Sequence, residues 1–216
     1  MTAPASSASE PTPGTDLHGD ELVRGQALRA EALESLLIEA DVLSSSEVDS
    51  YIETWNHRIG PMEGAKVVAR AWTDPGFQDR LLADPVAAVA EVGLNTGRLE
   101  RLEVVVNEPG VHNVVCCTLC SCYPWTVLGL PPSWYKSPEY RSRIVREPRQ
   151  VLAEMGLDLS PDVTINVWDS SAELRYLVIP ERPAGTDGLS EEELSELVTR
   201  DAMIGVAVVS PPTSAS

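Results

Sequence analysis

Every cysteine of this 216-residue chain lies in one short segment, at Cys116, Cys117, Cys120 and Cys122. The spacing Cys117-x-x-Cys120-x-Cys122 allows three thiolates to converge on a single ion if the backbone curls around it. In such a turn the remaining donors are the backbone nitrogens of Ser121 and Cys122, and only a strongly polarising ion, such as trivalent cobalt or iron, deprotonates an amide. The segment therefore indicates a metal site.

Two other interpretations stay open on the residues alone, a redox dithiol and a set of inert buried cysteines. Zinc is the main structural alternative, but zinc usually takes four ligands from two separated pairs, and the sequence has no second pair of Cys or His. Its three histidines, His18, His57 and His112, are scattered. In a reducing compartment, clustered cysteines bind metal or do redox chemistry more often than they build disulfides.

The composition predicts a globular, cytoplasmic protein. With 43% hydrophobic and 23% charged residues, the chain is long enough to bury a core. Its 33 acidic and 16 basic side chains give a formal net charge of -17, which repels phosphate backbones, so we expect no nucleic acid partner. No apolar run approaches the roughly 20 residues of a membrane span, and the first residues do not resemble a secretory signal. We expect no membrane partner.

Helical patterns fill the first part of the chain. Apolar residues recur at helical spacing over residues 23–40. Ser44 with Glu47 has the form of a capping box, which predicts a second helix there. Asp74-Pro75 and Asp84-Pro85 each place an N-cap residue before a proline suited to the first helical turn, so two short helices are expected to begin at these sites.

After residue 93 the pattern changes to alternation, which predicts strands over residues 102–106, 113–115, 163–167 and 177–179. Short helices are expected over 137–146 and 149–155 and from Ser190, which forms a capping box with Glu193. The basic stretch at 140–146 with Arg149 is interpreted as solvated or interface surface. Helices followed by a mixed region predict an α+β fold, with a helical N-terminal arm before the strand and helix domain that carries the cysteine loop.

The cysteine segment resembles the metal-binding signature of the nitrile hydratase α subunit. The likeness covers nearly the whole chain from about residue 19. It is carried by Cys117-Thr118-Leu119-Cys120-Ser121-Cys122, Tyr123-Pro124-Trp125, Leu128-Gly129-Leu130-Pro131-Pro132, Trp134-Tyr135-Lys136-Ser137 and Val167-Trp168-Asp169-Ser170-Ser171-Ala172-Glu173-Leu174-Arg175-Tyr176.

The resemblance implies that Cys117, Cys120 and Cys122 bind the metal with the backbone amides of Ser121 and Cys122. It also implies that Cys120 is oxidised to a sulfinic acid and Cys122 to a sulfenic acid. Cys120, Ser121 and Cys122 are then the catalytic residues. Thr118 resembles the cobalt type of the family, whereas the iron type carries Ser there, so we expect cobalt(III) in preference to iron(III).

The implied reaction is hydration of a nitrile to an amide, with the metal as a Lewis acid. The attacking oxygen stays open among hydroxide on the metal, free water and the sulfenate of Cys122. In the family, a separate β subunit supplies arginines that hold the oxidised cysteines, so the expected partners are a β subunit, in an αβ or α2β2 assembly, and a cobalt-delivering maturation protein. The alternatives are the metal-bearing subunit of thiocyanate hydrolase and a non-catalytic zinc-binding interaction module.

Five further positions carry interpretations that come with the resemblance. Asp169 and Glu173 match family carboxylates thought to act next to the metal ligands, against the alternative of two solvated acids on a turn. Trp125 either lines the substrate pocket or serves as a packing anchor. Cys116 replaces a common valine and is interpreted as a buried small hydrophobe, against the alternative of a competitor for the ion. Arg98 stands where many members carry glutamine, and its positive charge either alters substrate preference or is simply exposed.

The predicted organisation has four segments. Residues 1–19 form a disordered tail, because they show no hydrophobic periodicity. Residues 20–72 form a helical arm that packs on the partner subunit, 73–209 form the α+β metal-binding catalytic domain, and 210–216 form a flexible C-terminal tail.

Overall fold

The computed structural model describes residues 17–49, 61–94 and 101–212. Contacts within the chain divide it into two compact units, Met1–Ile52 and Glu53–Ser216. The predicted tail falls outside the described residues except at its end, because α1 begins at Leu17. Arg98 and His57 also lie outside them, as do the last residues of the predicted C-terminal tail.

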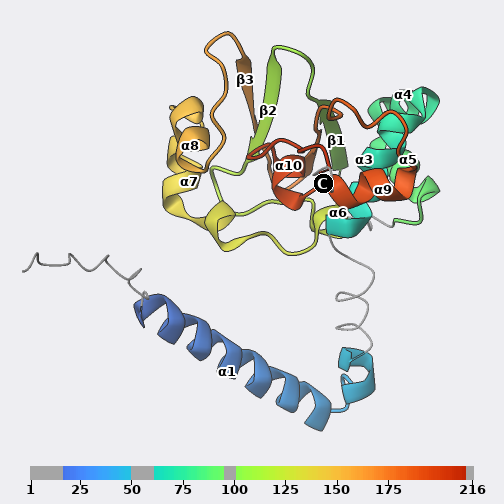
Figure 1. Ribbon diagram of the computed structural model, residues 1–216. Helices are drawn as coiled ribbons and strands as arrows, with labels where there is room; N and C mark the ends of the chain where they lie inside the picture. Colours follow the sequence, from blue (N-terminus) through green and yellow to red (C-terminus); the bar gives the residue numbers. More distant parts are fainter. Residues whose placement is uncertain (1–16, 50–60, 95–100, 213–216) are drawn as a thin grey trace, which may run out of the picture. The chain divides into compact units, whose positions relative to one another are not determined.

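The first unit is built on α1 (Leu17–Glu39), with a second helix that begins after Ser44 (Figure 1). The predicted capping box is confirmed, because Ser44 N donates to the Glu47 carboxylate at 2.8 Å and Glu47 N donates to Ser44 Oγ at 3.3 Å. Along α1, Leu28, Leu33 and Leu36 are 58–62% exposed. Within the described residues of the first unit, these side chains therefore have little to pack against.

In its described residues, the second unit mixes short helices with four strands, which confirms the predicted fold class. Three predicted helix starts are confirmed by side-chain caps at Asp74, Asp84 and Ser190. The elements of this unit, in chain order, are α3 (Pro61–Thr73), α4 (Pro75–Ala83), α5 (Pro85–Glu91), β1 (Arg101–Val106), β2 (Val111–Cys116), α6 (Trp125–Leu128), the 3-10 helix η1 (Ser133–Lys136), α7 (Pro138–Arg143), α8 (Pro148–Glu154), β3 (Thr164–Asp169), β4 (Leu174–Ile179), α9 (Glu191–Leu197) and α10 (Arg200–Ile204).

The strands form two parallel pairs, β1 with β4 and β2 with β3. Between β2 and β3 the chain passes through α6, η1, α7 and α8. In the second pair, the last residue of β2, Cys116, lies opposite the last residue of β3, Asp169. Because parallel strands end at the same edge, the cysteine loop after β2 begins beside the end of β3. This pairing positions the site.

One hydrophobic core joins residues of α3, α4 and α5 to strand residues and to the segments that follow the cysteine loop. Gly64 of α3 makes a close approach possible there, since a Cβ at this position would lie 2.9 Å from Leu128 Cδ2 and 2.9 Å from the sulfur of Met203. Leu128 belongs to α6, the helix that directly follows the cysteine loop. The loop is thus held at its far end by packing against α3.

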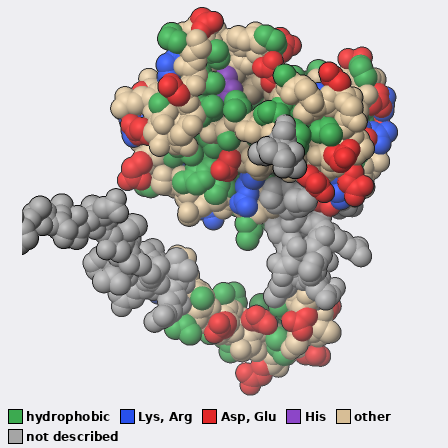
Figure 2. All heavy atoms as spheres, in the orientation of Figure 1, with side chains coloured by type: hydrophobic (Ala, Val, Ile, Leu, Met, Phe, Trp, Pro, Cys, Tyr) green, Lys and Arg blue, Asp and Glu red, His purple; other side chains and the backbone are tan. Residues whose placement is uncertain are grey.

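The face of the second unit drawn in Figure 2 carries acidic side chains scattered among uncharged ones. This distribution agrees with a formal net charge of -17 for the whole chain. Among the described helices, none combines the length and the apolar character that crossing a bilayer requires.

Candidate metal centre

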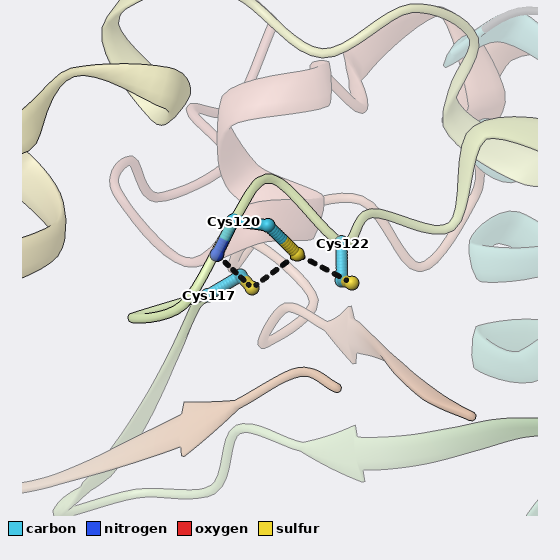
Figure 3. Close-up of side chains that lie close together, drawn as sticks. All are labelled: Cys117, Cys120 and Cys122. Carbon is cyan, nitrogen blue, oxygen red and sulfur yellow. Dashed lines mark hydrogen bonds between the residues drawn. The ribbon is translucent and has the colours of Figure 1, made fainter. Parts of the chain in front are cut away.

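The loop after β2 brings the sulfur atoms of Cys117, Cys120 and Cys122 together (Figure 3). All three lie within 4.8 Å of one another. The Sγ atoms of Cys117 and Cys120 are 3.5 Å apart, and those of Cys120 and Cys122 are 3.0 Å apart. Cys120 N also donates to Cys117 Sγ at 3.3 Å, which closes the turn. The curled backbone that the spacing predicted is therefore present.

The three sulfurs differ in exposure. Cys117 is fully buried and Cys122 is 9% exposed, whereas Cys120 is exposed. Hydrogen bonds from the thiols of Cys122 and Cys117 lower the pKa of Cys120 to about 7, whereas burial raises the pKa of Cys122. Cys120 thus ionises more readily than Cys122 and is the one of the three that is exposed, a combination that favours both metal binding and oxidation.

Cys116 does not belong to this group of sulfur atoms. Its side chain is fully buried in the hydrophobic core, and burial raises the pKa of its thiol to about 12. A thiol that stays protonated in apolar surroundings behaves as a small hydrophobe. The interpretation of Cys116 from the sequence agrees with this environment.

Asp169 holds the start of the cysteine loop. Its two carboxylate oxygens accept hydrogen bonds from Thr118 N at 2.9 Å and from Thr118 Oγ1 at 2.6 Å. The parallel pairing of β2 with β3 makes this contact possible across 51 sequence positions. Glu173 is placed differently, because its side chain is exposed and its backbone carbonyl accepts from Arg101 N at 3.3 Å. Of the two predicted carboxylates, the structure brings Asp169 to the loop.

Two tyrosines hold the loop from its buried side. Tyr135 Oη donates to the carbonyl of Cys122 at 2.8 Å, and Tyr140 Oη donates to the carbonyl of Val115 at 2.7 Å. Both rings are buried, and Trp134 packs edge-on against Tyr140 with 4.9 Å between centroids. The motif that includes Tyr135 was part of the family likeness, but nothing in the sequence pattern indicated that these hydroxyls reach the loop.

Arg141 also contacts the loop, because its Nη1 donates to the carbonyl oxygen of Cys120 at 2.5 Å. The interpretation of residues 140–146 and Arg149 as solvated or interface surface did not include this contact or those of Arg149. Arg149 donates to the carbonyls of Leu159, Ser160 and Val163 and so fixes the approach to β3. The Arg141 contact spans 21 positions, and no local spacing signals a bond of this kind.

An open cavity of about 280 Å³ lies over the cysteine loop. Trp125, predicted as a candidate pocket residue, is 39% exposed and lines this cavity. Arg175 lines it as well, donates to the carbonyl of Ser171, and places its positive charge near Cys122. The complete lining is Cys120, Ser121, Cys122, Tyr123, Trp125, Leu130, Pro131 and Arg175.

The donor set fits a thiophilic transition metal, because three sulfurs converge on one point. A tetrahedral zinc site would need a fourth ligand, and within the described residues no other Cys, His or carboxylate joins the group. His112, for example, is buried with both ring nitrogens engaged elsewhere. Together, the fold and the site define a mixed helix and strand chain with a candidate metal-binding cysteine loop beside a cavity.

Residues 24–207 match the family "Nitrile hydratase, alpha chain". The chain therefore belongs to the nitrile hydratase α-chain family, of which it is a metal-bearing catalytic subunit. An α chain of this family implies a β-chain partner.

Individual relatives agree with this assignment. The cobalt-containing nitrile hydratase α subunit of Pseudonocardia thermophila is 55% identical over 188 residues, which cover 87% of this chain and 92% of that one. The gamma subunit of thiocyanate hydrolase from Thiobacillus thioparus is 44% identical over 191 residues, covering 83% and 78%. A double mutant of the Fe-type nitrile hydratase from Comamonas testosteroni Ni1 has a similar structure, with a TM-score of 0.84, 42% identity, and coverage of 89% of this chain and 97% of that one.

Proposed function

We propose that this chain, paired with a β subunit, hydrates nitriles to amides at a trivalent cobalt ion held by the cysteine loop. One observation carries the proposal, namely the convergence of three thiol sulfurs within 4.8 Å at the floor of a cavity. The ligands would be the sulfurs of Cys117, Cys120 and Cys122 and the backbone nitrogens of Ser121 and Cys122. In the active form, Cys120 would be a sulfinic acid and Cys122 a sulfenic acid.

Bound there, a trivalent metal supplies Lewis-acid polarisation of the nitrile. The residues of this chain do the positioning. Asp169 fixes the start of the loop through Thr118, and Tyr135 fixes its end through the carbonyl of Cys122. Trp125 offers apolar surface beside the sulfurs for the organic part of a nitrile, as ligand pockets commonly do.

Cobalt rather than iron is supported by the relatives and by Thr118. The cobalt-containing relative is 55% identical and the Fe-type structure 42% identical. The hydroxyl of Thr118 donates to Asp169 at 2.6 Å, but a serine at this position can donate the same bond. The hydrogen bond itself thus gives no reason for a preference, and the choice of cobalt rests on the likeness.

The proposed assembly is an αβ heterodimer, or an α2β2 pair of them, in the cytoplasm, loaded by a cobalt-delivering maturation protein. Within the predicted arm at residues 20–72, α1 would pack on the β subunit, whereas α3 already packs in the core of this chain. Leu28, Leu33 and Leu36 support this role, because exposed apolar side chains along a helix favour a protein partner. Glu173, exposed in this chain, would act at the same interface together with Asp169.

Thiocyanate hydrolysis is the second candidate, favoured by the 44% identity to a thiocyanate hydrolase subunit. The test is to produce the chain with its β partner in cobalt medium and to assay one aliphatic nitrile, one aromatic nitrile and thiocyanate. We expect amide from at least one nitrile. A cobalt-loaded complex that consumes thiocyanate and neither nitrile would establish the second candidate instead, and a zinc-loaded complex inactive on all three would favour the interaction module.

A further inference from the structure

Arg141 brings a positive charge to the cysteine loop. Its Nη1 donates to the carbonyl oxygen of Cys120 at 2.5 Å. In the part of the chain that the structure describes, no ion pair includes Arg141, and its Nε is buried without a hydrogen-bond partner. The charge is therefore not neutralised by a carboxylate of the described chain.

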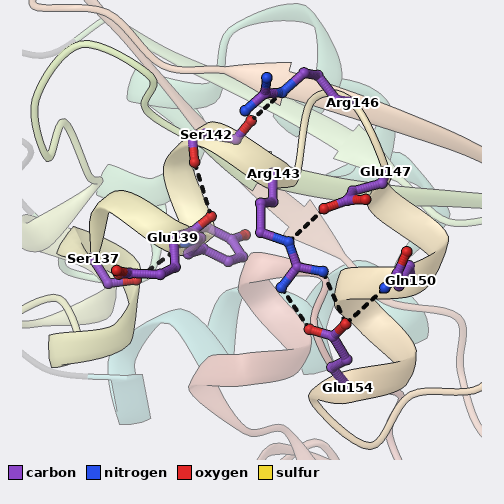
Figure 4. A network of polar contacts seen from close by, with 9 residues as sticks. Ser137, Glu139, Ser142, Arg143, Arg146, Glu147, Gln150 and Glu154 are labelled. Carbon is purple, nitrogen blue, oxygen red and sulfur yellow. Dashed lines mark hydrogen bonds and ion pairs between the residues drawn. The ribbon is translucent and has the colours of Figure 1, made fainter.

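The next arginines along the chain behave differently (Figure 4). Arg143 is neutralised, because its guanidinium pairs with Glu147 and with both carboxylate oxygens of Glu154, the latter at 2.7 and 2.8 Å. Arg146 donates to the carbonyl of Ser142 at 2.9 Å, within its own segment. Residues two apart on a helix do not share a face, so Arg141 and Arg143 diverge. Of these three arginines, Arg141 is the one that reaches the metal loop.

The carbonyl oxygen that Arg141 contacts belongs to the peptide group that contains a proposed metal ligand, the nitrogen of Ser121. The carbonyl of Cys120 and the nitrogen of Ser121 belong to the same peptide group, whose atoms share one conjugated, planar system. When such a nitrogen acts as an anionic ligand, part of the charge resides on the carbonyl oxygen. A guanidinium on that oxygen both orients the peptide plane and stabilises its charge, because hydrogen bonds between ionised groups are the strong ones.

We propose that Arg141 is a positioning residue of the metal centre, which fixes the Cys120–Ser121 peptide and stabilises Ser121 N as a ligand. This inference rests on the proposed function, since it requires a metal held by that nitrogen. It assigns to α7, a helix outside the cysteine motif, a direct influence on how tightly the metal is held. Partners that orient metal ligands in this way commonly contribute a factor of 10–100 to metal affinity.

The test compares Arg141→Met with Arg146→Met in the complex with the β subunit, produced in cobalt medium. Arg146 is a matched control, because it has the same chemistry, lies on the same segment and, among the described residues, donates its side-chain hydrogen bond to Ser142 and not to the cysteine loop. The readout is the rate at which cobalt is lost to a chelator, together with the position of the visible sulfur-to-metal absorption band. We expect Arg141→Met to lose cobalt roughly 10-fold to 100-fold faster and to shift the band, while Arg146→Met matches the wild type.

A second pair separates charge from folding. Arg141→Lys keeps the positive charge and Arg141→Gln removes it, so cobalt loss from the Lys variant should be the slower of the two, even if the Met variant does not assemble. Equal rates from the Lys and Gln variants, or a Met variant that holds cobalt as long as the wild type, would overturn the inference. A wild-type complex that carries no cobalt would overturn the proposed function and this inference with it, whereas a loaded, active wild type with unchanged variants overturns this inference alone.

Discussion

The two ends of strand β2 carry polar clusters that differ in how completely their groups are paired. At its amino end, His112 is buried, with Nε2 2.7 Å from the carbonyl of Gly205 and Nδ1 3.2 Å from Asn107 Nδ2. A carbonyl only accepts, so Nε2 carries the proton and Nδ1 accepts from Asn107. The oxygen of Asn107 in turn accepts from Asn113 N at 2.8 Å. This cluster is satisfied within the chain.

At the carboxyl end of β2, in and around the cysteine loop, some polar groups have no partner among the described residues. Cys120 is exposed, and two buried polar atoms, Arg141 Nε and Tyr123 Oη, have no hydrogen-bond partner among the described residues. Buried polar atoms are nearly always paired in folded proteins, and exceptions call for a ligand, a partner or a functional role. The two ends differ in whether their polar groups find partners within the chain. A cluster whose groups are all paired is structural, whereas unpaired groups mark a site that awaits a metal and a second chain.

The largest effect is expected from a substitution in the cysteine loop, at the carboxyl end of β2. Cys120→Ser should abolish cobalt retention and amide formation while leaving the helical circular dichroism near that of the wild type, because Cys120 is exposed and contributes little to the core. Cys116→Ala is the control, since that thiol lies in the core and outside the sulfur group. It should retain the metal and lose about 1 kcal/mol of stability. An active, metal-loaded Cys120→Ser complex would contradict the proposed ligand set.

A substitution at the amino end of β2, beside His112, should destabilise the chain without changing the metal ligands. Gly205 has φ +91°, and a Cβ there would lie 1.9 Å from the carbonyl oxygen of Asn113. Gly205→Ala should therefore lower the free energy of unfolding by at least ~3 kcal/mol, as measured by urea denaturation. Gly185 has φ +80° with open space around it, so Gly185→Ala should cost about 1 kcal/mol. Equal costs at the two glycines would rule out the clash.

A smaller effect is expected from Asp169→Asn. This substitution tests whether the carboxylate at the end of β3 holds the cysteine loop that follows β2. An amide nitrogen cannot accept the second bond from Thr118, so the loop start should loosen and cobalt should be lost roughly 10-fold to 100-fold faster to a chelator. Asp158→Asn, at an exposed position before β3, serves as the control and should match the wild type. Wild-type retention in Asp169→Asn would show that this carboxylate does not act on the metal loop.

The smallest effect is a pH dependence at the histidine end. Burial lowers the pKa of His112, so the folded chain binds this proton less readily than the unfolded chain. The stability that neutral His112 contributes is fully present above about pH 6.5 and decreases as the pH falls below it, by at most ~1.4 kcal/mol per pH unit. Urea denaturation at two pH values should show a steeper loss for the wild type than for His112→Gln. Identical slopes would contradict the assignment.

Features that depend on near neighbours in the chain were predictable. The caps at Asp74, Asp84 and Ser190 act over three residues, so their helices begin where the sequence indicated. The three metal-loop cysteines are likewise close enough that their spacing alone predicts convergence of Cys117 with Cys120 and Cys122. In both cases the contact joins residues only a few positions apart, so the backbone between them determines it.

Contacts between distant segments were not predictable in the same way. Alternating apolar residues indicated the strands, but not that β1 pairs with β4 and β2 with β3, both in parallel. The contacts of Asp169 with Thr118 and of Arg141 with Cys120 depend on that topology and span 51 and 21 positions. A single sequence contains no periodicity at such separations. The family resemblance singled out Asp169, but its contact with Thr118 and the whole role of Arg141 emerged only from the structure.

The central claim, that the cysteine loop holds a catalytic cobalt ion, is tested most directly by elemental analysis of the complex purified with its β subunit. We predict close to one cobalt per α chain, lost when Cys120 is replaced by serine. Near-stoichiometric iron would keep the family chemistry and contradict the choice of cobalt made from Thr118. Zinc in a fully assembled complex would contradict the catalytic role and leave Cys117, Cys120 and Cys122 as a structural site.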